Sequence, residues 1–313
     1  MKSQVVKIQE NIPLAPFTTF KIGGPARYFV EVSSEDELRE AVYYAKKNNL
    51  AIFILGGGSN ILVSDDGFNG LVIRIQDIRY QIQDTILLCG AGLLLSQAVK
   101  LAAENSLTGL EWAIGIPGST GGAIRGNAGA YGGCIGDSIE NIKVIEISKD
   151  LRLKTISGQE CKFSYRNSLF KEQKDLIILS AVLKLQKGEK DKIESKMKEI
   201  IEKRTGKLPQ EPSPGSFFKN PIVRNPTLIE RFEKDCNTKC KDNKLPAAWL
   251  IEEEGMKGKK IGSIMVSEKH ANFVVNTGGG KAQDVVILAS YIKQQVRDRL
   301  DVSLQEEIQY VGF

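Results

Sequence analysis

Residues 115–136 read GIPGSTGGAIRGNAGAYGGCIG. Nine of these 22 residues are glycine, and the others include Ile116, Ile124, Tyr131 and Ile135. A flexible linker with the same glycine content would be padded with serine, glutamine or lysine instead. Glycine lets the main chain adopt positive φ angles and approach a ligand closely. The stretch therefore predicts either main-chain N–H groups wrapped around a flat or phosphorylated ligand, or a tight corner packed within a β-structure.

The whole chain has the composition of a globular protein with more than one domain. It has 313 residues, of which 42% are hydrophobic and 26% are charged, and this length predicts two or three domains. No apolar run reaches the roughly 18 residues of a membrane span. The first ten residues lack the apolar centre of an export signal. We therefore expect a cytoplasmic, monomeric protein with no membrane partner.

Cysteine, histidine and charge exclude several classes of function. The five cysteines are an odd number, lie far apart and form no Cys-x-x-Cys, so we expect neither a disulfide framework nor a metal site. His270 is the only histidine, which argues against a Ser-His-Asp triad or a histidine metal cluster. The net charge of +5 gathers in 184–207 and 234–244 without interleaved aromatic residues. We expect solvated basic helices there and no nucleic-acid partner.

The N-terminal part predicts a β-α-β-loop-β unit. Ser34 and Glu37 form a capping box for a helix that ends near Asn49. A turn and strand are predicted over 17–32, before this helix, and further strands over 51–55 and 71–75. Glycines directly after a strand are typical of a phosphate-binding loop, but the segment after Asn60 is apolar and β-branched rather than helical. This spacing matches neither the dinucleotide-binding fingerprint nor the P-loop.

The rest of the chain predicts a second α+β unit and a third unit beyond a proline-rich connection. The expected strands cover 85–93, 142–148, 151–156, 176–185 and 304–312, and the expected helices cover 96–105, 189–203 and 282–300. The prolines of 207–214 mark the clearest domain boundary. The polar stretch 223–245 predicts a surface excursion of the third unit.

Six segments, in the same order as in a known family, resemble UDP-N-acetylenolpyruvoylglucosamine reductase, also called UDP-N-acetylmuramate dehydrogenase. Each segment is weak evidence by itself, but six in order with compatible gaps are specific. The segments are Phe17–Ala26, Leu55–Asn60, Gly115–Gly132, Tyr165-Arg166-x-Ser168, Gly215–Pro221 and Leu304-x-x-Glu307.

The resemblance implies an α+β fold with an FAD-binding domain of the p-cresol methylhydroxylase/vanillyl-alcohol oxidase type. Residues 1–75 would form its first subdomain, to which the strand within 304–313 would return, and 76–187 would form its second. An α+β substrate-binding domain would occupy 205–303. The resemblance also implies the substrate, UDP-N-acetylglucosamine enolpyruvate, and the electron donor, NADPH.

The resemblance assigns FAD to the two glycine-rich loops. The FAD is expected to be noncovalent, because residues 1–269 contain no histidine for a covalent link. The implied cofactor-binding residues are Leu55, Gly56, Gly57, Gly58, Ser59, Asn60, Gly115, Ile116, Pro117, Gly118, Ser119, Gly122, Asn127, Gly129, Ala130 and Tyr131.

The implied reaction places particular demands on three side chains. A hydride from the flavin N5 adds to C3 of the enolpyruvyl group, so negative charge develops at C2 and on the carboxylate. Such charge needs a cation or donors placed in advance, and the family pattern assigns Arg166 and Glu307 to this end. Ser216 matches the family's proton donor to C2. Lys207, Lys219 and Asn220 match positions that hold the sugar nucleotide.

Each of these residues also has an ordinary structural interpretation. Taken alone, Ser216 would suit a serine turn, Arg166 a surface ion pair and Lys207 the end of a helix. Glu307, beside Glu306, would suit a solvated strand edge. Alternative functions are a flavin-dependent alcohol or sugar oxidase of the same fold, and a sugar-nucleotide-binding protein without flavin.

Three features depart from the family pattern. Arg125 places a cation in a run where the family more often has an apolar residue, and Cys134 stands where glutamate is usual. The stretch 223–245 lengthens the substrate domain. The sequence alone assigns no role to any of them.

Overall fold

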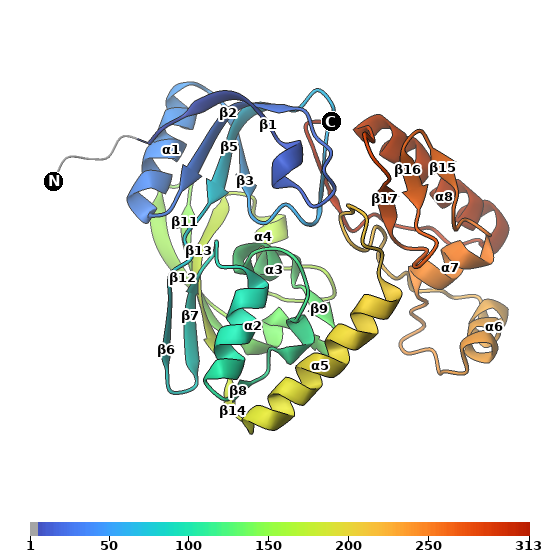
Figure 1. Ribbon diagram of the computed structural model, residues 1–313. Helices are drawn as coiled ribbons and strands as arrows, with labels where there is room; N and C mark the ends of the chain where they lie inside the picture. The colour runs from blue at the N-terminus through green and yellow to red at the C-terminus, as the bar shows by residue number, and fades with distance from the viewer. Residues whose placement is uncertain (1–5) are drawn as a thin grey trace. The chain divides into compact units, whose positions relative to one another are not determined.

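The computed structural model describes residues 6–313, and this part of the chain divides into two compact units (Figure 1). The first unit comprises the described residues up to Ile12 together with Ala26–Gly57 and Asn69–Gly206. The second comprises Pro13–Pro25, Gly58–Phe68 and Lys207–Phe313.

The first unit contains two sheets. The four-stranded sheet has the order β1-β2-β5-β3, and the five-stranded sheet has the order β12-β11-β13-β7-β6. The strands are β1 (Gln9–Pro13), β2 (Pro25–Val32), β3 (Ala51–Leu55), β5 (Phe68–Ile75), β6 (Tyr80–Gln83), β7 (Ile86–Gly90), β11 (Ile139–Glu146), β12 (Arg152–Ser157) and β13 (Leu176–Lys184). In the five-stranded sheet every neighbouring pair is antiparallel, whereas β3 and β5 pair in parallel.

Helix α1 (Glu35–Lys47) packs between these two sheets. Its N-cap Ser34 accepts a hydrogen bond from the Glu37 N–H, as the capping box predicts. Its apolar face shares one buried cluster with β2, β5 and the facing side of the five-stranded sheet, where Ile145 and Ile177 contribute. Alternate residues of a strand face opposite sides of a sheet, so neighbouring Val144 belongs to the cluster on the other side.

That other side of the five-stranded sheet carries the remaining helices of the first unit (Figure 1). They are α2 (Leu95–Glu104), α3 (Thr120–Gly126), α4 (Leu169–Glu172) and α5 (Lys190–Lys207), with three-residue and four-residue 3₁₀ turns at Glu111–Ala113 and Ile135–Ser138. Two short antiparallel pairs complete the unit: the hairpin of β9 (Gly129–Ala130) with β10 (Gly133–Cys134), and β8 (Leu107–Thr108) with β14 (Gln186–Lys187).

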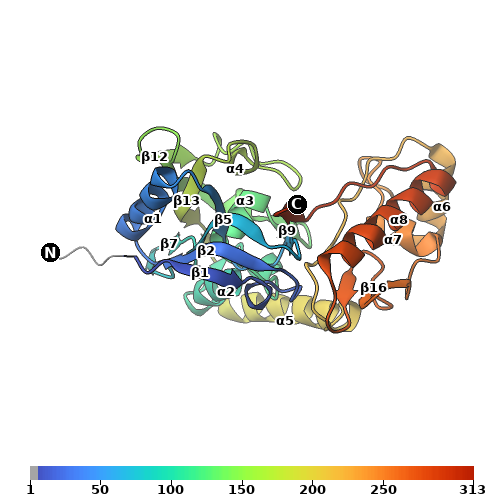
Figure 2. The same cartoon turned by 90° about the horizontal axis from the view of Figure 1, so that it is seen from above.

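The second unit is built on a three-stranded antiparallel sheet covered by helices. The sheet has the order β15 (Lys260–Ile261), β16 (Ile264–Val266), β17 (Val274–Asn276). Helix α7 (Ala247–Glu253) lies beside α8 (Ala282–Leu300), and α8 contacts β15 and β16 (Figure 2). The C-terminal strand β18 (Gln309–Val311) pairs in parallel with β4 (Ile61–Val63). A 3₁₀ turn spans Ala15–Phe17.

The stretch 223–245 is not the polar surface excursion that the sequence predicted, because part of it forms a helix with a buried apolar face. It contains helix α6 (Pro226–Cys236), which Asn225 caps by accepting a hydrogen bond from the Leu228 N–H. Leu228 and Phe232 are buried in the core of the second unit, and the Phe232 ring stacks edge-to-face on Trp249 at 5.3 Å. Only the solvent-facing side of this helix is polar, and the polar side chains concealed its apolar face in the sequence.

Candidate functional site

The two glycine-rich loops contact each other in the first unit, main chain against main chain. The loop after β3 brings Gly57 so close to Gly118 that a Cβ added to Gly57 would lie 2.5 Å from the Gly118 Cα. A Cβ added to Gly56 would lie 2.6 Å from the Ser119 Oγ. A side chain at Gly57 would push the loops apart because it would meet main-chain atoms, so this glycine is required by packing. Sequence segments some 60 residues apart thus form one structure.

The run 115–136 is not entirely extended, as it contains helix α3. Ser119 caps the helix by accepting a hydrogen bond from the Gly122 N–H at 3.3 Å. The hydroxyl of Thr120 donates to the Gly90 carbonyl at 2.7 Å, and a Cβ on Gly121 would meet the Ala91 Cβ at 2.8 Å. The helix therefore packs directly on the end of β7. This packing explains why the helix forms although four of the eleven residues Gly115–Arg125, which cover the loop and most of the helix, are glycine.

Asn127 ends α3 and begins the following hairpin. It has a φ of 43°, in the left-handed region that short polar side chains tolerate. Its side chain donates to the Ser164 carbonyl at 2.8 Å and accepts from the Gly136 N–H at 3.1 Å. In the hairpin turn, Tyr131 and Gly132 have φ values of 50° and 85°, the pattern of a tight type I′ turn.

Arg166 lies against this hairpin. Its guanidinium Nη1 donates to the Gly129 carbonyl at 3.0 Å, and the guanidinium carbon lies 5.6 Å from the centre of the Tyr165 ring. The hairpin and the loop 158–166 line an open pocket of about 680 Å³. Arg166, Tyr131 and Asn127 are among its lining residues, so the structure brings the predicted cation together with part of the predicted flavin loop.

Ser216 and Glu307 are held together in the second unit through Phe217. The Glu307 N–H donates to the Phe217 carbonyl at 2.8 Å, and Ser216 pairs with Phe273 on an antiparallel bridge. The Glu307 carbonyl in turn accepts from the Asn60 side-chain amide at 3.3 Å. The proton donor and the carboxylate that the sequence predicted are therefore on hydrogen-bonded neighbouring segments, although 91 positions separate them in the chain.

The adjacent carboxylate, Glu306, has a different role. Its side chain pairs with Lys293 of α8 at 2.9 Å, and it faces Phe218 on an isolated antiparallel bridge. Successive residues of an extended segment point to opposite sides. The ion pair of Glu306 with α8 is consistent with the choice of Glu307 for the reaction.

The predicted substrate-binding residues are spread along the second unit. The side-chain oxygen of Asn220 accepts from the Ala247 N–H at 3.0 Å and so caps the start of α7. Lys207 is the last residue of α5, and it begins the C-terminal segment of the second unit, Lys207–Phe313. Lys219 follows the Ser216 segment, and its main-chain N–H donates to the Gln305 carbonyl at 2.9 Å.

The two unassigned residues of the glycine run have local contacts. Arg125 lies in the last turn of α3, where burial lowers the pKa of its guanidinium, and its carbonyl accepts from the Ser168 hydroxyl at 2.7 Å. The thiol of Cys134 caps the 3₁₀ turn at Ile135–Ser138, and burial together with neighbouring Asp137 raises the pKa of this thiol.

Sequence reasoning missed Asn272. It is 4% exposed, and both polar atoms of its side chain bond to the main chain of Phe218, two positions after Ser216. A signal was present, because an asparagine between Ala271 and the apolar Phe273–Val275 is an unusual buried polar group that needs hydrogen-bond partners.

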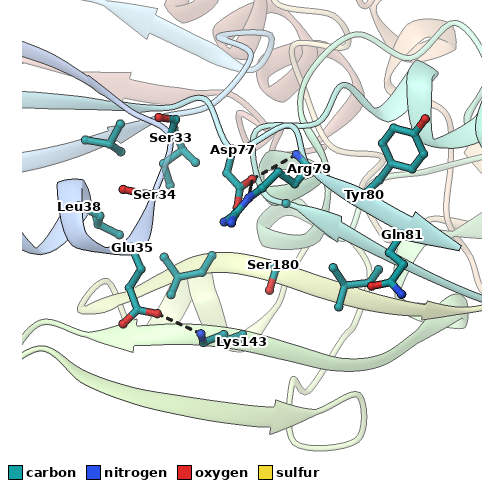
Figure 3. Close-up of a pocket in the computed structure, with 15 residues that line it drawn as sticks. Ser33, Ser34, Glu35, Leu38, Asp77, Arg79, Tyr80, Gln81, Lys143 and Ser180 are labelled. Atoms are coloured by element: carbon teal, nitrogen blue, oxygen red, sulfur yellow. Dashed lines mark hydrogen bonds and ion pairs between the residues drawn. The ribbon is translucent and has the colours of Figure 1, made fainter. Parts of the chain in front are cut away.

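A second pocket of the first unit, of about 330 Å³, contains none of the predicted site residues (Figure 3). It lies where the start of α1 faces the five-stranded sheet. Its charged groups pair with each other: Lys143 with Glu35 at 3.0 Å and Arg79 with Asp77 at 2.8 Å. These ion pairs satisfy the charges that a ligand would otherwise bind.

Two findings concern the described residues as a whole. Within 6–313, none of the helices has the length and apolar character needed to cross a membrane. In the same residues, no cluster of His, Cys, Asp or Glu side chains is arranged to hold a metal ion.

Comparisons with known proteins match both parts of the chain. Residues 26–149 match the family model of an FAD binding domain, and residues 207–311 match that of the C-terminal domain of UDP-N-acetylenolpyruvoylglucosamine reductase.

Relatives and a solved structure match nearly the whole chain. A UDP-N-acetylenolpyruvoylglucosamine reductase from Carboxydothermus hydrogenoformans is 40% identical, over 97% of this chain and 94% of the relative. One from Caldanaerobacter subterraneus is 39% identical, over 98% and 94%. The crystal structure of the Thermus caldophilus enzyme aligns with a TM-score of 0.76 and 32% identity, covering 98% of each chain.

Proposed function

Because the chain belongs to the UDP-N-acetylenolpyruvoylglucosamine reductase family, we propose that Arg166, Ser216 and Glu307 carry out the acid–base and electrostatic part of its reaction. The protein is an FAD-dependent reductase of peptidoglycan precursor synthesis. Its substrates are UDP-N-acetylglucosamine enolpyruvate and NADPH. The predicted α+β fold, with an FAD-binding domain of the p-cresol methylhydroxylase/vanillyl-alcohol oxidase type, is confirmed.

The glycine loops suit the cofactor. The close approach of Gly57 to Gly118 leaves main-chain groups rather than side chains along both loops, and such groups are suited to a pyrophosphate. We assign FAD to the loops 55–60 and 115–131. When bound, FAD supplies hydride transfer from NADPH to C3 of the enolpyruvyl group. The protein's residues have to bind and orient the reactants and to move a proton.

Arg166 supplies the fixed positive charge. Hydride addition at C3 leaves negative charge at C2 and on the adjoining carboxylate, and a guanidinium can bind a carboxylate through two parallel N–H groups. The hydrogen bond from Arg166 to the Gly129 carbonyl holds the guanidinium in place before substrate binds. A charge placed in advance stabilises the transition state without reorganisation. Glu307 orients the carboxylate end of the substrate.

Ser216 donates the proton to C2. The observation that carries this assignment is the hydrogen bond from the Glu307 N–H to the Phe217 carbonyl, which fixes the two segments that hold Ser216 and Glu307. A serine hydroxyl is a weak acid in water, but a positioned one beside a strongly basic carbon can act as a general acid. The alkoxide that remains is reprotonated from solvent.

The Ser216→Ala variant tests the assignment in two half-reactions. We expect NADPH to reduce its flavin at the wild-type rate, whereas reoxidation by UDP-N-acetylglucosamine enolpyruvate slows by about 10²–10⁴-fold, the usual contribution of a general acid. Anaerobic stopped-flow at flavin wavelengths measures both rates. Ser213→Ala is the matched control from the same loop. The Thr19 hydroxyl donates to the main-chain carbonyl of Ser213, so this hydrogen bond does not depend on the serine side chain that the substitution removes. Equal slowing of both half-reactions in Ser216→Ala would make Ser216 structural.

We further propose that the enzyme is a cytoplasmic monomer with neither nucleic-acid nor membrane partners. All five cysteines are free thiols, which suits a reducing compartment. The basic helix α5 has lysines that pair with carboxylates, including Lys192 with Glu189 at 2.6 Å and Lys196 with Glu111 at 3.7 Å. Light scattering coupled to gel filtration should give a mass near 34.5 kDa; a mass of twice this value would reject the monomer.

A further inference from the structure

The segment that contains Ser216 is the middle one of three extended segments in the second unit. On one side, the Phe217 N–H donates to the Asn272 carbonyl at 2.8 Å. On the other side, the Phe217 carbonyl accepts from the Glu307 N–H at 2.8 Å, and the Lys219 N–H donates to the Gln305 carbonyl at 2.9 Å. These bonds fix Phe217 and Lys219. The main-chain N–H and carbonyl of Phe218, which lies between them, need other hydrogen-bond partners.

Asn272 supplies those partners with its side chain. Its Oδ1 accepts from the Phe218 N–H at 2.9 Å, and its Nδ2 donates to the Phe218 carbonyl at 2.9 Å. The side-chain amide of Asn272 thus bonds to both main-chain polar groups of Phe218, as the main chain of a neighbouring strand would. Phe218 is 1% exposed, so both groups would pay the full cost of desolvation if the amide were lost.

The residue before Ser216 does not fix its position. Gly215 has a φ of 83°, and a Cβ added there would meet no atom within 4 Å among the described residues. Glycine in open space leaves the chain free to rotate. The position of the Ser216 hydroxyl therefore depends on the residues that follow it, which Asn272 holds, and on its own bridge to Phe273.

We propose that Asn272 is a positioning residue that keeps Ser216 aligned for proton donation. The proposal rests on the function proposed above for Ser216. Asn272 lies next to Phe273, which pairs with Ser216, and it bonds to both Phe217 and Phe218. A displacement of about 1 Å of a reacting group can cost about 10²-fold in rate, so loss of this clamp should slow proton transfer while flavin reduction continues.

The Asn272→Asp variant tests the proposal through its pH dependence. The two side chains have nearly the same shape. An ionised aspartate can still accept from the Phe218 N–H, but its second oxygen faces the Phe218 carbonyl without a proton to donate. A protonated carboxyl group restores that donor. Reoxidation by UDP-N-acetylglucosamine enolpyruvate should therefore slow by about 10²-fold at high pH and recover as the pH falls, with flavin reduction by NADPH at the wild-type rate throughout.

Asn276→Asp is the matched control. Asn276 is also a buried asparagine, 5% exposed, at the end of β17. Its side chain accepts from the Gly278 and Gly280 N–H groups at 3.0 Å and donates to the Phe20 carbonyl at 3.2 Å. This variant carries a similar risk to stability without touching the Ser216 segment. We expect it to leave the ratio of the two half-reaction rates at the wild-type value at every pH.

Asn272→Ser provides a second measurement, because it removes the clamp without adding a charge. It should slow reoxidation at all pH values and show no recovery in acid. If both Asn272 variants change the two half-reactions equally, or fail to fold, Asn272 serves stability alone and the proposal is wrong. If Ser216→Ala itself leaves reoxidation unchanged, the proposed function of Ser216 fails instead. If Ser216→Ala slows reoxidation and the Asn272 variants do not, only the positioning role fails.

Discussion

Replacing Gly57 by alanine tests whether the contact between the two glycine loops determines FAD affinity. The new Cβ would lie 2.5 Å from the Gly118 Cα and 3.0 Å from both the Gly118 carbonyl carbon and the Ser119 nitrogen. All three are main-chain atoms, so no side chain can rotate away. Nonbonded carbon atoms prefer a separation of about 3.5 Å or more, so the loops have to part by about 1 Å.

The expected cost follows from that displacement. Forcing an extra carbon into a packed site costs about 1–3 kcal/mol. The loops can part in the apoprotein but have to close again around FAD, so the cost falls mainly on binding. Since 1.4 kcal/mol corresponds to a tenfold change, we expect Gly57→Ala to weaken FAD binding by about 5–150-fold.

Titration of apoprotein with FAD, followed by flavin fluorescence, measures this effect. Gly56→Ala should give a smaller loss, because its new Cβ meets the Ser119 hydroxyl, which can rotate. Gly206→Ala is the control: its Cβ meets no atom within 4 Å among the described residues, and it lies in α5. The reasoning is refuted if folded Gly57→Ala binds FAD as tightly as the wild type, or if Gly206→Ala loses as much affinity.

Two further predictions concern stability and reactivity. Burial lowers the pKa of His270, so the unfolded chain takes up a proton near pH 6.5 that the folded chain resists. The free energy of unfolding should therefore fall as the pH drops below about 6.5, by at most about 1.4 kcal/mol per pH unit. His270→Gln should reduce this slope in urea titrations at pH 5, 6 and 7, and an unchanged slope would contradict the burial argument. Burial raises the pKa of Cys89 to about 12, while Cys236 is exposed. A disulfide reagent at pH 8 should therefore modify Cys236 in the native protein and Cys89 only after unfolding. Mass spectrometry of the labelled peptides locates each modification, and labelling of Cys89 in the native protein would contradict this order.

Secondary structure could be predicted where the apolar pattern was long and regular. The last helix, α8, spans the predicted 282–300, and β3 spans the predicted 51–55. The prediction failed at α3, because glycine disfavours helix and the packing on Gly90 and Ala91 that supports it is not visible in the local sequence.

The C-terminal segment shows a related limit. A strand was predicted over 304–312, but β18 covers only Gln309–Val311. The preceding residues bond instead to 217–219, through single bridges and hydrogen bonds rather than a continuous ladder. An extended, alternating pattern cannot distinguish these two arrangements, because the partner segments lie far away in the chain.

The amino-acid order alone supplied the candidate groups: the glycine loops proposed to bind FAD, and the arginine, the serine and the carboxylate proposed for the reaction. It also carried the family assignment, through six motifs in order. Which groups lie together was decided by tertiary structure. The approach of Gly57 to Gly118, the bond between the Ser216 and Glu307 segments, and the clamp by Asn272 all join residues far apart in sequence. Such contacts depend on the packing of whole sheets and helices around them, since hydrogen bonds between distant segments form only when a shared core holds both segments in register.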